Sequence, residues 1–210
     1  MTTTTTEPTL RPPPAARPIP VPARQRNLSV GVFCGARTGP PEAVALAREL
    51  GELLGRCGHR LVYGGGGSGL MGTVAWAAYE HGAEILGVIP QFLAERERSI
   101  AAPPQELRIT DTMCERKDLI VAEADVFIAL PGGYGTVDEV LDVLSLSYLQ
   151  VHEKPLVLLQ PGQEWKAFLD LLDTLVGCGY ADPIGSRMLQ VTDDAADALR
   201  MLHASPARVA

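Results

Sequence analysis

The sequence lacks the features that define several classes of protein. It has no apolar run near the length of a membrane span. It does not open with a basic segment, an apolar segment and a cleavage site of the kind that directs secretion. Basic residues number 18 against 25 acidic ones, and the net charge of -7 argues against a surface for nucleic acid polymers. We therefore expect a cytoplasmic protein that binds neither membranes nor nucleic acid.

Cysteine is also scarce. The four cysteines are scattered, with no C-x-x-C pair and no Cys/His spacing typical of a metal site. We expect reduced thiols that lie mostly in the core, and no metal. They are Cys34, Cys57, Cys114 and Cys178.

The length and composition predict one domain. The chain has 210 residues, 46% of them hydrophobic, which is enough for one sizeable core. Residues 1–27 are rich in threonine and then in proline and have almost no large apolar residue, which is typical of a disordered tail. A partner motif within its prolines is the alternative. Residues 28–205 form the predicted domain.

Within that domain, predicted strands alternate with predicted helices. The alternation indicates an α/β, Rossmann-like doubly wound fold, with a mostly parallel sheet and helices on both faces. Apolar runs bounded by turn residues predict strands at 28–34, 59–63, 84–89, 107–109, 124–130 and 154–159. Helical periodicity predicts helices at 41–57, 70–81, 92–100, 111–123, 140–151, 165–175 and 195–202.

Three glycine-rich turns follow predicted strands, at residues 35–39, 64–72 and 131–139. Right-handed crossovers between parallel strands bring such turns together at the carboxyl edge of the sheet, and we expect the ligand there. The first turn is not the G-x-G-x-x-G of a dinucleotide site. The second lacks the lysine of a P-loop, so nucleoside triphosphate hydrolysis is not indicated.

The third turn carries the strongest functional signal. Gly132, Gly133 and Gly135 leave backbone N–H groups bare at the start of a helix, where the helix dipole favours an anion. Thr136 adds a hydroxyl, and Glu139 adds a carboxylate one helical turn further on. Thr136 and Glu139 also fit a capping box. A simple cap does not need so much bare backbone, so we favour a nucleotide site.

Three cations elsewhere are candidates for the same site. Arg37 follows the first turn, and the sequence fits equally well with its pointing into the site or into solvent. Arg116 and Lys117 are adjacent in the predicted helix 111–123. Such a pair usually lies on the surface, but this one comes just before the strand that leads into the third turn. It is therefore well placed to meet an anion.

Several motifs together resemble the Lonely-guy family, whose members are nucleoside 5'-monophosphate phosphoribohydrolases, many of them cytokinin-activating. The family was formerly described as lysine decarboxylase-like. Motifs at consistent spacing are more specific than one glycine loop. They are V-F-C-G at 32–35, L-V-Y-G-G-G at 61–66, G-L-M-G at 69–72, V-I-P at 88–90, M-x-x-R-K at 113–117 and P-G-G-x-G-T-x-x-E at 131–139.

The resemblance implies roles for particular residues. Arg116 and Glu139 match the family's catalytic pair, and neither a cofactor nor a metal is expected. The resemblance also implies a homodimer in which each active site is completed by the neighbouring subunit. The matching substrate-binding positions are Gly35, Gly65, Gly66, Glu97, Met113, Lys117, Gly132, Gly133, Tyr134, Gly135, Thr136 and Ser145.

The favoured hypothesis is hydrolysis of the N-glycosidic bond of a nucleoside 5'-monophosphate to free base and ribose 5-phosphate. A non-catalytic carrier of a phosphorylated ligand, such as a pterin cofactor, is the alternative. Lysine decarboxylation is weakly supported, because no lysine is evidently placed for a pyridoxal Schiff base. An Arg116–Glu139 salt bridge confined to the surface would remove the basis for catalysis.

The chain also departs from the family pattern. Ala36 and Arg37 stand where the family usually has serine after C-G, and Cys114 replaces the histidine of M-H-x-R-K. Leu146 and Tyr148 replace a tryptophan and a glutamine near the expected base. The base preference is therefore the property that the resemblance transfers least well.

Overall fold

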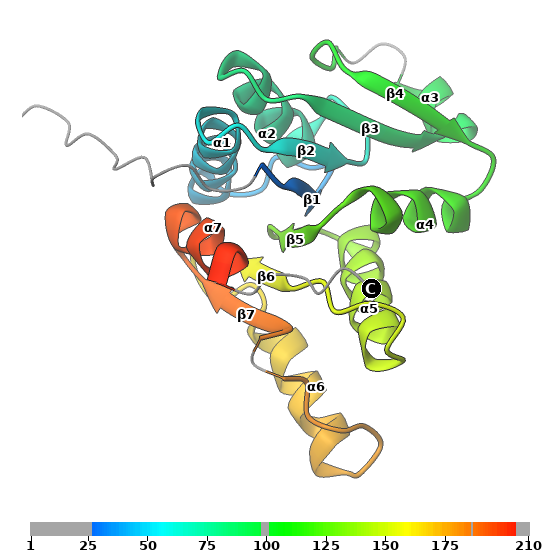
Figure 1. The fold of residues 1–210 in the computed structure, drawn as a ribbon, viewed down its shortest axis with the longest axis vertical. Helices are drawn as coiled ribbons and strands as arrows, with labels where there is room; N and C mark the ends of the chain where they lie inside the picture. Colours follow the sequence, from blue (N-terminus) through cyan, green and yellow to red (C-terminus); the bar gives the residue numbers. More distant parts are fainter. Residues whose placement is uncertain (1–26, 98–100, 186, 205–210) are drawn as a thin grey trace, which may run out of the picture.

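A computed structural model describes residues 27–97, 101–185 and 187–204, in which strands and helices alternate (Figure 1). The predicted tail at 1–27 lies outside the described residues except for Asn27. The strands are β1 (Ser29–Phe33), β2 (Arg60–Tyr63), β3 (Ile85–Pro90), β4 (Glu106–Thr110), β5 (Val126–Ala129), β6 (Leu156–Leu159) and β7 (Leu189–Thr192). The helices are α1 (Pro41–Arg56), α2 (Gly69–Glu80), α3 (Gln91–Glu97), α4 (Met113–Glu123), α5 (Tyr134–Tyr148), α6 (Lys166–Gly177) and α7 (Ala195–Ala204).

The strands form one parallel sheet in the order β4-β3-β2-β1-β5-β6-β7, which confirms the predicted doubly wound fold. One core cluster joins the sheet to α1, α2 and α7, and a second joins its other face to α4, α5 and α6. The chain leaves β1 in one direction toward β2 and later returns to β5 on its other side. The strand order therefore reverses between β1 and β5, which is where such sheets bind ligands.

The described helices include none that is long and apolar enough to cross a membrane.

Two expectations were wrong. Strand β7 was not predicted. It has four residues, L-Q-V-T, of which every second one is polar, and it is only partly buried because it lies at the edge of the sheet. The cysteines are not mostly in the core either, since Cys34 alone among the four is buried. Cys57 and Cys178 cap the C-terminal ends of helices, and Cys114 lies in the first turn of α4, where side chains reach solvent. All four thiols are free.

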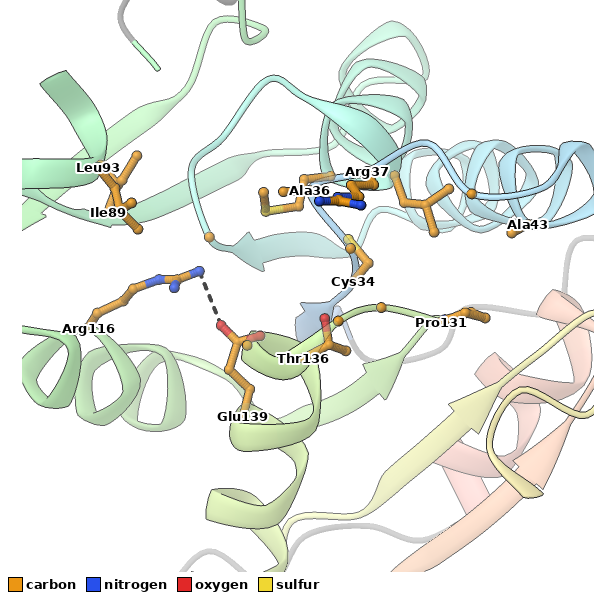
Figure 2. A pocket seen from close by; sticks show the side chains of 18 of the residues that line it. Cys34, Ala36, Arg37, Ala43, Ile89, Leu93, Arg116, Pro131, Thr136 and Glu139 are labelled. Carbon is orange, nitrogen blue, oxygen red and sulfur yellow. Dashed lines mark ion pairs between the residues drawn. The ribbon is translucent and has the colours of Figure 1, made fainter. Parts of the chain in front are cut away.

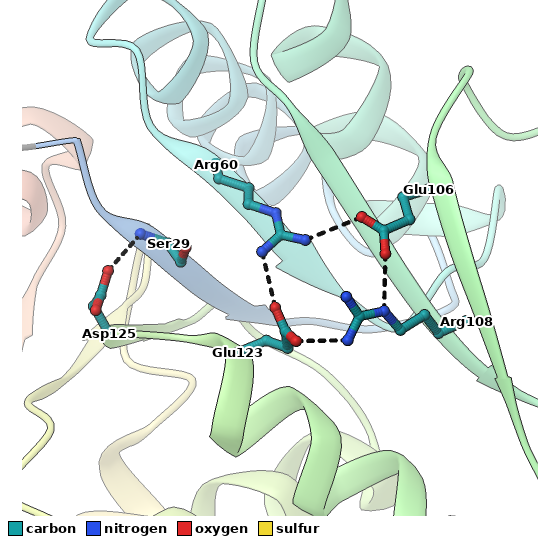
Figure 3. Close-up of polar contacts among 6 residues, drawn as sticks. All are labelled: Ser29, Arg60, Glu106, Arg108, Glu123 and Asp125. Carbon is teal, nitrogen blue, oxygen red and sulfur yellow. Dashed lines mark hydrogen bonds and ion pairs between the residues drawn. The ribbon is translucent and has the colours of Figure 1, made fainter.

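A network of ion pairs holds the C-terminal end of α4 against the sheet (Figure 3). Arg60 on β2 donates to Glu123 at 2.9 Å and to Glu106 at 3.2 Å. Arg108 on β4 donates to the same two carboxylates, at 2.5 Å to Glu123 and 2.8 Å to Glu106. Because β3 lies between β2 and β4, the network bridges three strands and fastens the last residue of α4 to them.

We expect Glu123→Gln to destabilise the fold by about 1 kcal/mol at neutral pH, the order of magnitude for partly exposed pairs. Burial raises the pKa of Glu123, but the bonds from Arg60 and Arg108 outweigh it and hold the pKa below its usual range. A depressed pKa stabilises the fold above the unfolded-state pKa, and this contribution disappears as the pH falls through the folded-state value. Urea unfolding at neutral and acidic pH would measure the change.

Glu80→Gln, at the exposed end of α2, is the matched control. A loss in Glu123→Gln that stays constant into acid would contradict an electrostatic origin.

Candidate active site

A cavity of about 580 Å³ opens at the carboxyl ends of the central strands (Figure 2). Its walls come from the turns after β1, β2 and β5, from the end of β3, and from parts of helices α1 to α5. Gly35, Gly64 and Gly132 each line it, one from each glycine-rich turn. The expectation that the three turns gather at this edge is confirmed.

The first turn holds the other two in place. Gly35 N–H donates to the carbonyl of Pro131 at 3.2 Å, and Leu70 N–H donates to the carbonyl of Gly35 at 3.1 Å. Gly132 is required by this close packing, because a Cβ there would lie 2.6 Å from the Cβ of Thr136 and 2.9 Å from the nitrogen of Gly35. The backbone of the third turn is therefore fixed before any ligand arrives.

Helix α5 begins earlier than the apolar pattern suggested, at Tyr134, with Gly133 as its N-cap and no side-chain cap. Thr136 is thus inside the first turn, buried and lining the cavity. The capping-box alternative is wrong for this reason, since Thr136 does not precede the helix. The first turn of α5 instead borders the cavity through Gly133, Gly135 and Thr136, an arrangement that suits an anion.

Arg116 and Glu139 meet inside this cavity. Arg116 Nη2 lies 3.1 Å from Glu139 Oε1, and the two residues are only 8% and 6% exposed (Figure 2). Arg116 Nε also donates to the carbonyl of Val88 at 3.2 Å. The guanidinium lies so close to Gly64 that a Cβ at that position would collide with Nη2. The pair is therefore a buried feature of the site, and the surface salt-bridge alternative is wrong.

The environment of Glu139 brings the pKa of its carboxyl group close to neutral pH. Burial raises its pKa to about 7, with Arg116 lowering the value, Asp138 raising it and Lys117 lowering it. Both protonation states are therefore accessible close to pH 7, which suits a group that takes up or gives a proton.

A fold with this site has close relatives. The family model described as possible lysine decarboxylase matches residues 71–202. A cytokinin riboside 5'-monophosphate phosphoribohydrolase from Mycobacterium tuberculosis is 40% identical over 82% of this chain and 91% of its own. One from Rhodococcoides fascians is 39% identical over 83% of this chain and 88% of its own. The chain belongs to the Lonely-guy family.

Solved structures agree on the fold. A molybdenum cofactor binding protein from Rippkaea orientalis has a TM-score of 0.64 at 20% identity, covering 85% of this chain and 97% of that one. A molybdenum cofactor carrier protein from Chlamydomonas reinhardtii has a TM-score of 0.63 at 25% identity, covering 85% and 99%. The Lonely-guy fold is thus shared with proteins that have carrier names.

The structure brings together some of the predicted substrate-binding residues and separates others. Gly35, Gly132, Gly133, Gly135 and Thr136 line the cavity together with the Arg116–Glu139 pair. Gly65 and Gly66 are buried but do not line it. Gly65 adopts a positive φ of 76°, and a Cβ there would lie 3.2 Å from the Cβ of Ile89. The second turn reaches the cavity through Gly64 instead.

The remaining predicted positions lie around this group. Met113 is half-buried and contacts Arg116, with Sδ 3.9 Å from Nη1. Lys117 binds Asp138 at 3.2 Å and Asp142 at 3.4 Å, and thereby joins α4 to α5. The other three are not among the residues that line the cavity. Tyr134 is 97% exposed, Ser145 lines a second cavity between α5 and α6, and Glu97 ends α3 with its side chain outside the described residues.

Sequence reasoning missed part of the cavity wall. Cys34 lines it directly before Gly35, and burial raises the pKa of its thiol, as does the charge of Glu139. The position of Cys34 at the end of a strand was a usable signal. Ile89 and Leu93 form an apolar wall on the side of Arg116 (Figure 2). Leu93 gave no signal, because its segment is dominated by charged residues typical of a solvated helix face.

The raised pKa of Glu139 predicts how its replacement changes stability. The folded state keeps the proton above the usual pKa of 4.5, so wild-type stability falls as the pH rises from there to about 7 and stays lower above it. The glutamine of Glu139→Gln cannot ionise, so the stability of the variant does not fall with pH in this way. Relative to wild type, the variant should gain up to about 3 kcal/mol between acid and mildly alkaline pH.

Urea unfolding across this pH range would measure the difference, with Glu153→Gln at an exposed position as the control. Arg116 attracts Glu139 only where the carboxyl group is ionised, and this attraction is already included in the pKa of about 7, so the comparison needs no separate correction for it. Stability curves that run parallel with pH would refute the raised pKa.

Proposed function

We propose that the protein hydrolyses the N-glycosidic bond of a nucleoside 5'-monophosphate, giving free base and ribose 5-phosphate. The observation that carries the proposal is the buried Arg116–Glu139 pair, which shares one cavity with the N-terminal turn of α5. Relatives at about 40% identity over most of the chain are named for this reaction on cytokinin riboside 5'-monophosphates. An anion site and a titratable carboxylate together fit such a substrate.

The phosphate would bind at the start of α5, to the backbone N–H groups around Gly133 and Gly135 and the hydroxyl of Thr136. This contact supplies binding energy away from the reacting bond and fixes the ribose against Glu139. A nucleoside without phosphate should therefore react poorly.

Glu139 would act on the attacking water. Cleavage passes through an oxocarbenium-like transition state, which a carboxylate stabilises while it orients or deprotonates water. The water oxygen bonds to the anomeric carbon as the carbon–nitrogen bond breaks, and the base leaves with the electron pair and takes up a proton. Arg116 favours the ionised carboxylate and holds it at 3.1 Å.

The apolar wall of Ile89 and Leu93 offers a surface for a planar base. The relatives' names make a cytokinin riboside 5'-monophosphate the first substrate to test, with AMP as the unmodified purine. We include no nucleic acid polymer, membrane, metal or cofactor in the proposal. A cytoplasmic location is also part of it, supported by four free thiols.

A carrier function is less well supported. The carrier structures resemble this chain at 20 to 25% identity, whereas the enzymes reach 40%. A carrier also has little need of a buried carboxylate beside a bound anion, because the two negative charges repel.

Glu139→Gln tests the proposal, because it keeps the side-chain shape and removes the base. We expect kcat to fall about 100- to 10,000-fold while AMP binding is retained. Wild-type turnover should rise with pH through about 7, as Glu139 ionises. Chromatography of the free base would measure turnover, and calorimetry would measure binding.

The exposed Glu153→Gln variant should keep wild-type turnover. Unchanged turnover in Glu139→Gln would remove Glu139 from the mechanism, and no base released from any nucleotide by wild type would refute the function.

The C-terminal part of α5 and the residues after it support a homodimer. Leu141, Tyr148, Leu149 and Val151 are all more than 40% exposed, which is unusual for large apolar side chains so close together. We propose that this face pairs with its copy about a two-fold axis and completes the neighbouring site. Ser145 lies on the same helix outside its own active-site cavity, so it could act only from the other subunit.

Leu149→Glu, at a position 65% exposed, should give folded monomers that have lost most turnover. Burying a carboxylate against an apolar copy is costly, so the dimer should dissociate. Light scattering and circular dichroism would measure size and folding. Tyr79→Glu is the control, since Tyr79 is 42% exposed and belongs to α2, which packs on the opposite face of the sheet from α5 (Figure 1). A fully active wild-type monomer at micromolar concentration would contradict the shared site.

A further inference from the structure

Arg37 is a cation of the cavity that the mechanism above does not use. It lines the cavity from the turn after β1. Figure 2 places it on the same side as Cys34, Thr136 and Pro131, whereas Leu93 lies on the other side. Arg37 is therefore at the end where α5 begins and away from the apolar wall.

The backbone of Arg37 is held in position. Its carbonyl accepts a hydrogen bond from Leu70 N–H at 3.4 Å. Gly69 packs so closely that a Cβ there would lie 2.6 Å from the carbonyl carbon of Arg37. Two residues earlier, the N–H of Gly35 donates a hydrogen bond to the carbonyl of Pro131 at the start of the third turn. The side chain of Arg37 therefore extends from a loop whose backbone is fixed and is hydrogen-bonded to the third glycine-rich turn, where the phosphate is proposed to bind.

Charge pairing leaves Arg37 available. Arg116 is paired with Glu139, and Lys117 with Asp138 and Asp142. Among the ion pairs of the described residues, none involves Arg37. A phosphate dianion at α5 would otherwise meet only backbone N–H groups, a helix dipole and a hydroxyl. An unpaired guanidinium in the same cavity supplies the missing countercharge.

We propose that Arg37 binds the phosphate group of the substrate and sets the preference for nucleoside monophosphates over nucleosides. The inference rests on the phosphate position proposed above, and it does not depend on turnover. Among the residues 35–39 that line the cavity, Arg37 is the one with a polar side chain, since Gly35, Ala36 and Gly39 have none and Thr38 does not line it.

Calorimetric binding of inorganic phosphate, AMP and adenosine tests this. AMP is titrated in a Glu139→Gln background, so that it is not consumed. Arg37→Ala should weaken phosphate and AMP about tenfold or more, the usual effect of a lost charged hydrogen bond, and adenosine less than about twofold. Arg37→Lys should recover part of the loss, because it keeps the charge without the planar fork. Weakening by added salt should be smaller in Arg37→Ala.

Two variants calibrate the result. Arg48→Ala removes an exposed arginine of α1 outside the cavity and should bind like wild type. Gly133→Val should abolish phosphate binding, because the added side chain would occupy the proposed phosphate position. The variant should fold normally, because a Cβ at this position meets open space.

Phosphate affinity in Arg37→Ala equal to that in Arg48→Ala overturns the proposal, and so does an equal loss for AMP and adenosine. Wild-type protein that does not bind phosphate at all overturns it too. If wild type releases no base from any nucleotide while Arg37→Ala still weakens phosphate, the hydrolase proposal fails and this one stands. If wild type and Arg37→Ala both release base normally and bind phosphate equally well, this proposal fails and the hydrolase proposal stands.

Discussion

The buried ion pair between Arg116 and Glu139 is the interaction that the rest of the site depends on. Removing two charges from water is expensive, and the attraction between them repays the cost only when the geometry is good and other hydrogen bonds are satisfied. The chain meets this condition with a carbonyl acceptor at Val88 and with Gly64, which leaves room for the guanidinium. A glycine-rich turn is thus needed here to admit a side chain as well as a ligand. The attraction to Arg116 does not fully offset the desolvation of Glu139, because burial still raises its pKa to about 7.

Helix α4 must be fixed for that pair to form, and it is held at both ends. Arg116, the fourth residue of α4, binds the sheet through Val88, and Glu123, its last residue, binds two arginines from β2 and β4. The two residues are seven apart and therefore share one helix face. Lys117 adds a tie to α5 through Asp138 and Asp142. Helix α4, which carries Arg116, is therefore fastened to the sheet and to α5, which carries Glu139.

The central strands and the glycine turns could be predicted because their signals are local. A strand buried on both faces is a continuous apolar run, and a turn that excludes Cβ atoms needs glycine, as Gly132 shows. What could not be predicted depends on contacts between distant segments. Strand β7 is defined by pairing with β6, since its own sequence is half polar. The start of α5 was placed too late because Gly133, Tyr134 and Gly135 carry no apolar periodicity, although they cap and open the helix.

The two ends of the cavity differ in charge, and this difference affects the pKa of Glu139 when a phosphate binds. At one end Arg116 and Glu139 largely cancel, while at the other the start of α5 and Arg37 are uncompensated. A phosphate bound without a countercharge would place negative potential near Glu139 and raise its pKa beyond the value of about 7, which would keep the carboxyl group protonated. A cation at the phosphate end offsets that potential. Under the proposed mechanism, a charge at Arg37 that binds the phosphate would therefore also limit the rise in the pKa of Glu139, so that substrate binding would not keep the proposed base protonated.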